Sequence, residues 1–124
     1  MVKISKQIKK LIEENALAFA TVDKNGNPHC IAVGYAKVVE GNKIVITDVG
    51  MKETVRNILR KNKVAIAVWN KDWEKNCIGY EIKGEASIFT SGKWKNFVDK
   101  MEENKGLNPK GAILVKINKV KKLA

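Results

Sequence analysis

The hydrophobic positions predict three amphipathic helices, because they recur at the three- and four-residue spacing that places side chains on one helix face. The first covers about 4–14, the second 51–62, and the third follows Ser91, which can serve as its N-cap, and ends in 104–111. The apolar faces consist of Ile4, Ile8, Leu11 and Ile12 in the first helix, Met51, Val55, Ile58 and Leu59 in the second, and Trp94, Phe97, Val98 and Met101 in the third.

Six strands account for most of the remaining sequence. β-Branched runs and apolar–polar alternation predict them at 16–22, 29–39, 43–49, 64–69, 78–88 and 112–121. Asn25-Gly26 and Glu40-Gly41-Asn42 are typical of tight turns, so the first three strands are expected to form a meander. Gly79 and Gly84 are expected to mark a bulge or a bend in the long fifth strand.

These elements predict an α+β chain, mainly β, in which six antiparallel strands form a barrel with three short helices. Closure is favourable in a small protein because it removes exposed strand edges. The 124 residues contain no linker, repeat or low-complexity segment. A single domain over 1–124 is therefore expected.

The net charge of +11 favours anionic partners: nucleic acid, phosphorylated small molecules or an acidic membrane. The lysines are spread along the chain, so a lysine-rich solvated surface explains the charge equally well. No apolar run approaches the roughly 18 residues that span a bilayer, and the N-terminal sequence lacks the apolar core of a secretory signal. We therefore expect a cytoplasmic protein with no membrane contact, in which Cys30 and Cys77 are free thiols.

Several classes of catalytic or ligand site are not indicated. His29 is the only histidine and no Cys-x-x-Cys pair exists, so a zinc site is not expected. The chain has no Gly-x-Ser-x-Gly elbow, no P-loop and no Gly-x-Gly-x-x-Gly fingerprint. Glu81 and Glu85 share the exposed face of one strand, which explains them better than a catalytic pair does. No catalytic residue is assigned.

The segment Gly50–Asn62 is the most informative part of the chain. A β-branched strand leads into a helix whose first turn carries Gly50, Lys52 and Thr54, and Arg56 and Asn57 follow one turn later. A helix N-terminus exposes unpaired N–H groups and the positive end of the helix dipole, so this turn suits a phosphate. A capped surface helix with no ligand is the alternative.

Ordered matches along nearly the whole chain resemble one known family. They lie at Ala18–Val22, Gly26–His29, Glu40–Ile46, Gly50–Ile58, Asn62–Val68 and Gly79–Ala86. In this order they are similar to the pyridoxamine 5′-phosphate oxidase-like FMN-binding split-barrel family, especially its short FMN-binding members. The resemblance implies a split barrel and a homodimer with FMN at the subunit interface.

The resemblance also implies positions for the FMN site. The phosphate would be held by Lys52, Thr54, Arg56 and Asn57. The isoalloxazine ring would lie between two strands, with Cys30, Ile31, Ala32 and Val33 on one side and Ile46, Thr47, Asp48 and Val49 on the other. The partner subunit would supply an aromatic or basic side chain, for which the candidates are Trp69, Trp73 and Trp94. One departure is Glu53, which stands where one variant of the family motif has a lysine.

The leading hypothesis is therefore an FMN-binding flavoprotein, either an oxidoreductase that uses NAD(P)H or a small electron carrier with a protein redox partner. The end of the chain, 117–124, lacks the arginine and histidine with which true pyridoxamine phosphate oxidases hold substrate, so that activity is not expected. The alternatives are a family member that binds another cofactor, such as haem or F420, and a basic nucleic-acid-binding barrel. The last is disfavoured because the strands lack the interleaved surface aromatics on which bases stack.

Overall fold

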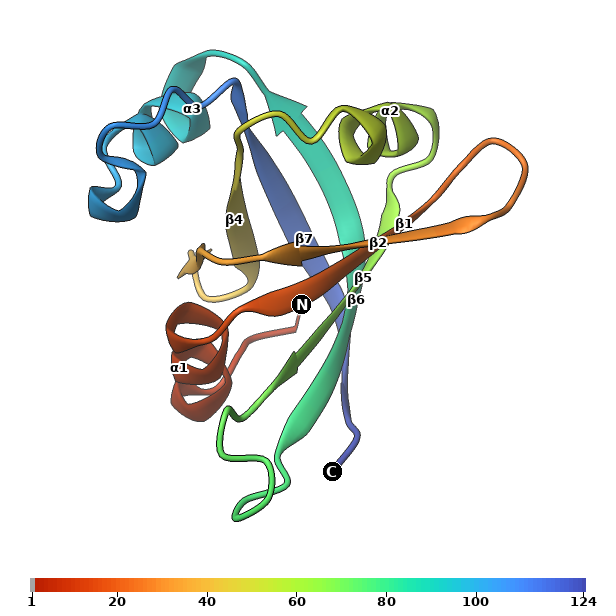
Figure 1. The fold of residues 1–124 in the computed structure, drawn as a ribbon, viewed down its shortest axis with the longest axis vertical. Coiled ribbons are helices and arrows are strands. Elements are labelled where there is room, and N and C mark those ends of the chain that lie inside the picture. The colour runs from red at the N-terminus through yellow and green to blue at the C-terminus, as the bar shows by residue number, and fades with distance from the viewer. Residues whose placement is uncertain (1) are drawn as a thin grey trace.

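The structure is a computed structural model that describes residues 2–124, and these form three α-helices, one 3₁₀ helix and seven strands (Figure 1). The helices are α1 (Lys6–Glu14), α2 (Lys52–Arg60), α3 (Gly92–Asp99) and the 3₁₀ helix η1 (Glu102–Asn104). The strands are β1 (Leu17–Val22), β2 (Pro28–Val33), β3 (Ala36–Val39), β4 (Lys43–Asp48), β5 (Lys63–Trp69), β6 (Gly79–Phe89) and β7 (Gly111–Lys122).

All seven strands belong to one open, strongly curled antiparallel sheet, in the order β2-β1-β5-β6-β7-β4-β3. The mainly-β architecture with three helices confirms the predicted fold class, but the prediction of six strands was wrong. The expected barrel closure is also not observed, since the sheet is an open half-barrel with β2 and β3 at its two edges. The segment 29–39 is not one strand. It breaks at Gly34-Tyr35 into β2, which pairs with β1, and β3, which pairs with β4. Because β1 and β4 lie near opposite edges of the sheet, the chain has to bend between β2 and β3. The alternation of hydrophobic and polar residues does not predict such a bend.

The two predicted hairpin turns are confirmed. Gly26 (φ 82°) lies in the turn between β1 and β2, where the Asp23 Oδ1 atom accepts hydrogen bonds from the amides of Asn25 (2.8 Å) and Asn27 (2.9 Å). Glu40 (φ 53°), Gly41 (φ 75°) and Asn42 connect β3 to β4, and the positive φ of the first two residues produces a tight turn. The predicted bulge is also confirmed at one glycine, since the β6–β7 register shifts between Lys83 and Gly84.

The main core fills the concave side of the sheet. Its largest fully buried side chains include Phe19, Leu17, Ile66 and Ile82, and α1 and α2 pack beside it. A smaller cluster lies between α3 and the other face of β4 and β7, and contains Val45, Val98, Met101 and Ala112. β4 is therefore buried on both faces: Ile44 and Ile46 belong to the main core, whereas Val45 belongs to the α3 cluster.

One predicted helix face differs from the observed face. Leu59 of α2 is 72% exposed, whereas Thr54 and Asn57 are buried beside Ile58. Asn57 is tolerated inside because its amide Nδ2 donates to the Thr21 hydroxyl of β1 at 3.0 Å. Within 2–124, no helix has the length and apolar character needed to cross a bilayer.

An ion pair joins the 3₁₀ helix to β3. The Lys37 Nζ atom lies 2.7 Å from the Glu103 Oε2 atom, and this hydrogen bond raises the pKa of Lys37 and lowers the pKa of Glu103. A carboxyl whose folded pKa is depressed contributes stability at neutral pH that is lost as the pH falls through that pKa.

We therefore expect Glu103→Gln to lower the free energy of unfolding at pH 7 by up to about 1 kcal/mol, and this difference to shrink as the pH falls through the lowered pKa of Glu103. Urea denaturation of both proteins at a series of pH values from neutral to acidic measures the difference. A difference that does not change with pH would contradict the prediction.

Candidate functional site

The turn between β4 and α2 is organised by one carboxylate. The Asp48 Oδ1 atom accepts hydrogen bonds from the amides of Gly50 and Met51, each at 2.8 Å. Gly50 has a φ of 131°, which an L side chain rarely adopts, so the glycine is required for this turn. Met51 occupies the N-cap of α2 and makes no side-chain capping bond. The Lys52 amide donates to the Gly50 carbonyl at 2.9 Å, whereas the next first-turn amides, of Glu53 and Thr54, have no side-chain acceptor among residues 2–124, as an anion site requires.

A hollow of about 320 Å³ lies between the edge strand β2 and this first turn. We call it the strand–helix hollow. Its lining consists of His29 and Ile31 from β2, and of Gly50, Met51, Lys52, Glu53 and Thr54. Residues from the two segments predicted to enclose the cofactor thus meet here, although they are about 20 positions apart.

Thr54 is the most unusual residue of the hollow. Thr54 is only 1% exposed, and its hydroxyl has no hydrogen-bond partner among the described residues. A buried hydroxyl without a partner costs about 1–3 kcal/mol. Such a cost is expected at a site where a ligand oxygen completes the hydrogen bonding.

The charges at the strand–helix hollow are mixed. Lys52 supplies a cation, whereas Glu53 is an acid and would oppose a phosphate. The Glu53 Oε2 atom lies 3.4 Å from the His29 Nδ1 atom, and the Glu53 side chain is 58% exposed. Because the Glu53 carboxylate is largely in contact with water, solvent screens its repulsion of an anion in the hollow.

The far side of α2 is anchored to the β1–β2 hairpin. The Arg60 guanidinium donates to the carbonyls of Val22 (2.8 Å) and Asp23 (2.7 Å), and Asn57 donates to Thr21. Neither Asn57 nor Arg56 therefore lines the strand–helix hollow with Thr54. Asn57 secures the helix, and Arg56 is exposed and lines two other hollows around α2, one of which it shares with Lys52.

The residues predicted to contact the ring are distributed over different faces. Ile31 lines the strand–helix hollow, whereas Cys30 and Ala32 are exposed on the opposite face of β2. Val33 and Ile46 are buried in the main core, and Val49 is 51% exposed.

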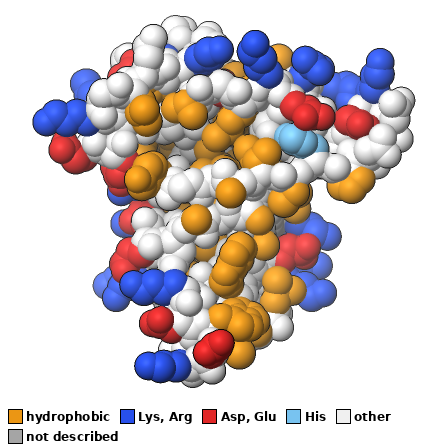
Figure 2. Space-filling view, in the orientation of Figure 1, with side chains coloured by type: hydrophobic (Ala, Val, Ile, Leu, Met, Phe, Trp, Pro, Cys, Tyr) orange, Lys and Arg blue, Asp and Glu red, His pale blue; other side chains and the backbone are white. Residues whose placement is uncertain are grey.

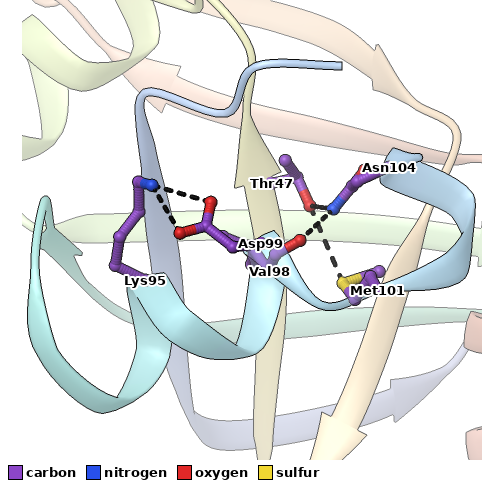
Figure 3. Close-up of polar contacts among 6 residues, drawn as sticks. All are labelled: Thr47, Lys95, Val98, Asp99, Met101 and Asn104. Atoms are coloured by element: carbon purple, nitrogen blue, oxygen red, sulfur yellow. Dashed lines mark hydrogen bonds and ion pairs between the residues drawn. The ribbon is translucent and has the colours of Figure 1, made fainter. Parts of the chain in front are cut away.

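Thr47 lies beneath α3 and η1 rather than in the strand–helix hollow (Figure 3). Its hydroxyl accepts a hydrogen bond from the Asn104 Nδ2 atom at 2.8 Å and contacts the Met101 sulfur at 3.8 Å. The same Asn104 amide donates to the Val98 carbonyl at 2.8 Å. Thr47 therefore anchors the segment that leads into β7.

The outer face of β2, β1 and β5 carries mainly small side chains where these strands pair. Neighbouring cross-strand residues there are small: Ala18 pairs with Ala32 and Ala67, and Ala20 pairs with Cys30 and Ala65. We call these six residues the alanine face. Figure 2 shows hydrophobic side chains in a band down the middle of the molecule, with charged side chains mainly at its margins. Such a surface suits contact with another protein.

An apolar hollow continues the alanine face at Ala67. It is lined by Ala67, Val68, Trp69, Trp73, Gly79 and Leu123, and both tryptophans are more than 40% exposed. Trp94, in contrast, packs on Phe97 in the α3 cluster. Of the three tryptophans predicted as candidates to cover a ligand, Trp69 and Trp73 have the exposure for that role.

Sequence reasoning missed Lys110, which lies near the start of α2. Its amide donates to the Asp48 carbonyl at 2.8 Å, and its side chain lines a hollow with Lys52 and Arg56. No local pattern around Pro109-Lys110-Gly111 signals this position, since it depends on the pairing of β7 with β4. Among residues 2–124, no group of three His, Cys, Asp or Glu side chains could hold a metal ion.

Comparisons with known proteins find sequence similarity to one family over most of the chain. The family model of pyridoxamine 5′-phosphate oxidase matches residues 4–124. An uncharacterized protein of Methanocaldococcus jannaschii is 30% identical, over 97% of this chain and 80% of the relative.

Solved structures share the fold at lower sequence identity. HupZ of Group A Streptococcus has a TM-score of 0.86 at 23% identity, covering 97% of this chain and 94% of that one. An FMN-binding protein of Syntrophomonas wolfei has a TM-score of 0.77 at 20% identity, with coverages of 94% and 83%. An F420 reductase has a TM-score of 0.72 at 20% identity, with coverages of 97% and 98%.

The match over 4–124, together with the curled seven-stranded sheet and the order of its helices, confirms the resemblance found in the sequence. The chain belongs to the pyridoxamine 5′-phosphate oxidase family.

Proposed function

We propose that residues 1–124 form one FMN-binding unit of a homodimeric, cytoplasmic flavoprotein oxidoreductase or electron carrier. The observation that supports this most is the unpartnered hydroxyl of Thr54, which is buried beside the open first turn of α2. A phosphate there would receive the Thr54 hydroxyl, first-turn amides and the Lys52 ammonium. The donor set fits a phosphate monoester, since it consists of hydrogen-bond donors and one cation.

The ring would lie against the edge of β2. Among residues 2–124, β2 pairs only with β1, so its other edge presents free backbone donors and acceptors next to Ile31 and Met51. FMN, when bound, supplies the redox chemistry. The protein would orient the ring, hold its polar edge by backbone hydrogen bonds, and exclude water with the apolar side chains.

The homodimer is proposed from the alanine face. Small side chains allow two sheets to approach closely, and the adjoining apolar hollow exposes Trp69 and Trp73 where a partner could use them to cover a ring. The electron donor is proposed to be NAD(P)H or a redox protein. We assign no catalytic residue of the chain.

The test is the spectrum of the protein after mild purification, followed by titration with FMN. Flavin bands, or quenched flavin fluorescence with a dissociation constant in the micromolar range or below, are expected. Riboflavin, which lacks the phosphate, should bind at least tenfold more weakly because it loses the charge-assisted hydrogen bonds. No flavin bands and no binding at micromolar FMN would refute the proposal.

F420 is the second candidate, because an F420 reductase shares the fold over nearly its whole length. The same titration with F420 and with haem separates these cofactors by their absorbance bands. Salt-dependent binding of an oligonucleotide, without cofactor binding, would instead favour the nucleic-acid alternative.

A further inference from the structure

A second hollow flanks the first turn of α2 on the side away from β2. It has a volume of about 380 Å³ and lies between α2 and the start of β7, so we call it the helix–β7 hollow. It is lined by Asp48, Gly50, Met51, Lys52, Val55, Arg56, Leu59 and Lys110. Gly50, Met51 and Lys52 line both hollows, so the two meet at one turn.

The helix–β7 hollow is rich in cations that lack a counter-charge. Lys52, Arg56 and Lys110 line it, and none of them forms an ion pair with a carboxylate of residues 2–124. The one acid of the lining is Asp48, which is 7% exposed and whose Oδ1 atom already accepts two backbone hydrogen bonds. Three cations around one hollow repel each other unless an anion lies between them.

The backbone holds the two rims of this hollow together. The Asp48 carboxylate secures the turn before α2, and the Asp48 carbonyl accepts the Lys110 amide at 2.8 Å. The next residue, Gly111, pairs with Asp48 in the sheet. The Thr47–Asn104 hydrogen bond fixes the preceding segment from the other face of β4 (Figure 3). The position of Lys110 is thus fixed by its own amide hydrogen bond and by the pairing of Gly111 with Asp48, although its side chain is exposed.

We propose that the helix–β7 hollow is a second anion subsite and that it adjoins the phosphate position of the strand–helix hollow. A ligand with two neighbouring anionic groups, such as a diphosphate, would then place one group on each side of Lys52. The first subsite rests on the proposed function. The second rests on the three cations and on the position of Lys110.

The experiment compares ligands with one and with two anionic groups. Inorganic phosphate and pyrophosphate are titrated by calorimetry, and FMN and FAD by flavin fluorescence, with wild type, Lys110→Gln and Lys105→Gln. Lys105 is an exposed lysine of the same connecting segment and does not line either hollow. Lys110→Gln should weaken pyrophosphate by about fivefold and phosphate or FMN by less than about twofold, because only the second group contacts Lys110. Lys105→Gln should change neither.

Two results would overturn the proposal: wild type that binds pyrophosphate no more tightly than phosphate, or a Lys110→Gln variant that weakens both ions equally. FAD distinguishes the source of the diphosphate. If Lys110→Gln weakens the binding of FAD as well as that of pyrophosphate, the natural ligand is a flavin dinucleotide. If FAD does not bind while pyrophosphate shows the expected selectivity, the ligand is a separate diphosphate. If neither flavin binds and the pyrophosphate result holds, the flavin proposal fails and the second subsite stands.

Discussion

Gly84→Ala is expected to lower the free energy of unfolding by roughly 3 kcal/mol, or to prevent folding. A Cβ atom at this position would lie 2.4 Å from the Lys116 carbonyl oxygen and 2.8 Å from the Val115 Cγ1 atom. The clash involves the backbone of β7, which cannot move without breaking the pairing at the bulge between Lys83 and Gly84. Even a single methyl group therefore has to displace a central strand.

Gly34→Ala is the matched control. Gly34 is exposed between β2 and β3, and a Cβ atom there would meet no atom within 4 Å. Its effect should stay within about 0.5 kcal/mol. Urea denaturation followed by circular dichroism compares the two variants with wild type. Equal stabilities for Gly84→Ala and Gly34→Ala would show that β7 yields at the bulge.

The second large effect concerns the anion site. Lys52→Ala combined with Thr54→Ala is expected to weaken FMN by roughly 2–4 kcal/mol, which corresponds to about 30- to 1,000-fold in the dissociation constant. The double variant loses the ammonium and the buried hydroxyl that would contact the phosphate. Lys61→Ala combined with Thr90→Ala removes the same two residue types at exposed positions away from the hollow and should leave affinity unchanged. An unchanged dissociation constant in the first variant would place the phosphate elsewhere.

Thr54→Val separates binding from stability. Valine has the shape of threonine without the hydroxyl, so it removes the buried group that has no partner within residues 2–124. The free energy of unfolding of the ligand-free protein should rise by about 1 kcal/mol, whereas FMN affinity should fall. A residue with a purely structural role would change both in the same direction. Lower stability of Thr54→Val would mean that the hydroxyl is satisfied by water.

The candidate site shows how far sequence reasoning extends. The helix start was predicted from Gly50, Lys52 and Thr54, and all three line the strand–helix hollow. The family resemblance grouped Arg56 and Asn57 with them, but neither lines this hollow. Asn57 donates to Thr21, and Arg56 lines the helix–β7 hollow on the other side of the first turn. Likewise, Thr47 follows Ile46 in the same strand, and successive side chains of a strand face opposite ways. The side chains of adjacent residues in the sequence therefore lie on different faces of the structure.

Local patterns in the sequence determined the mainly-β class, the three helices and both hairpin turns, because these depend on residues a few positions apart. The family was identified from the order of such patterns along nearly the whole chain. Which strands pair with one another was decided only by the tertiary structure. It broke 29–39 into β2 and β3 at opposite edges of the sheet, and it brought Lys110 beside Asp48 from more than 60 positions away. Such contacts arise from long-range strand pairing and sheet curvature, which depend on the whole chain and leave no mark on the hydrophobic pattern of any one segment.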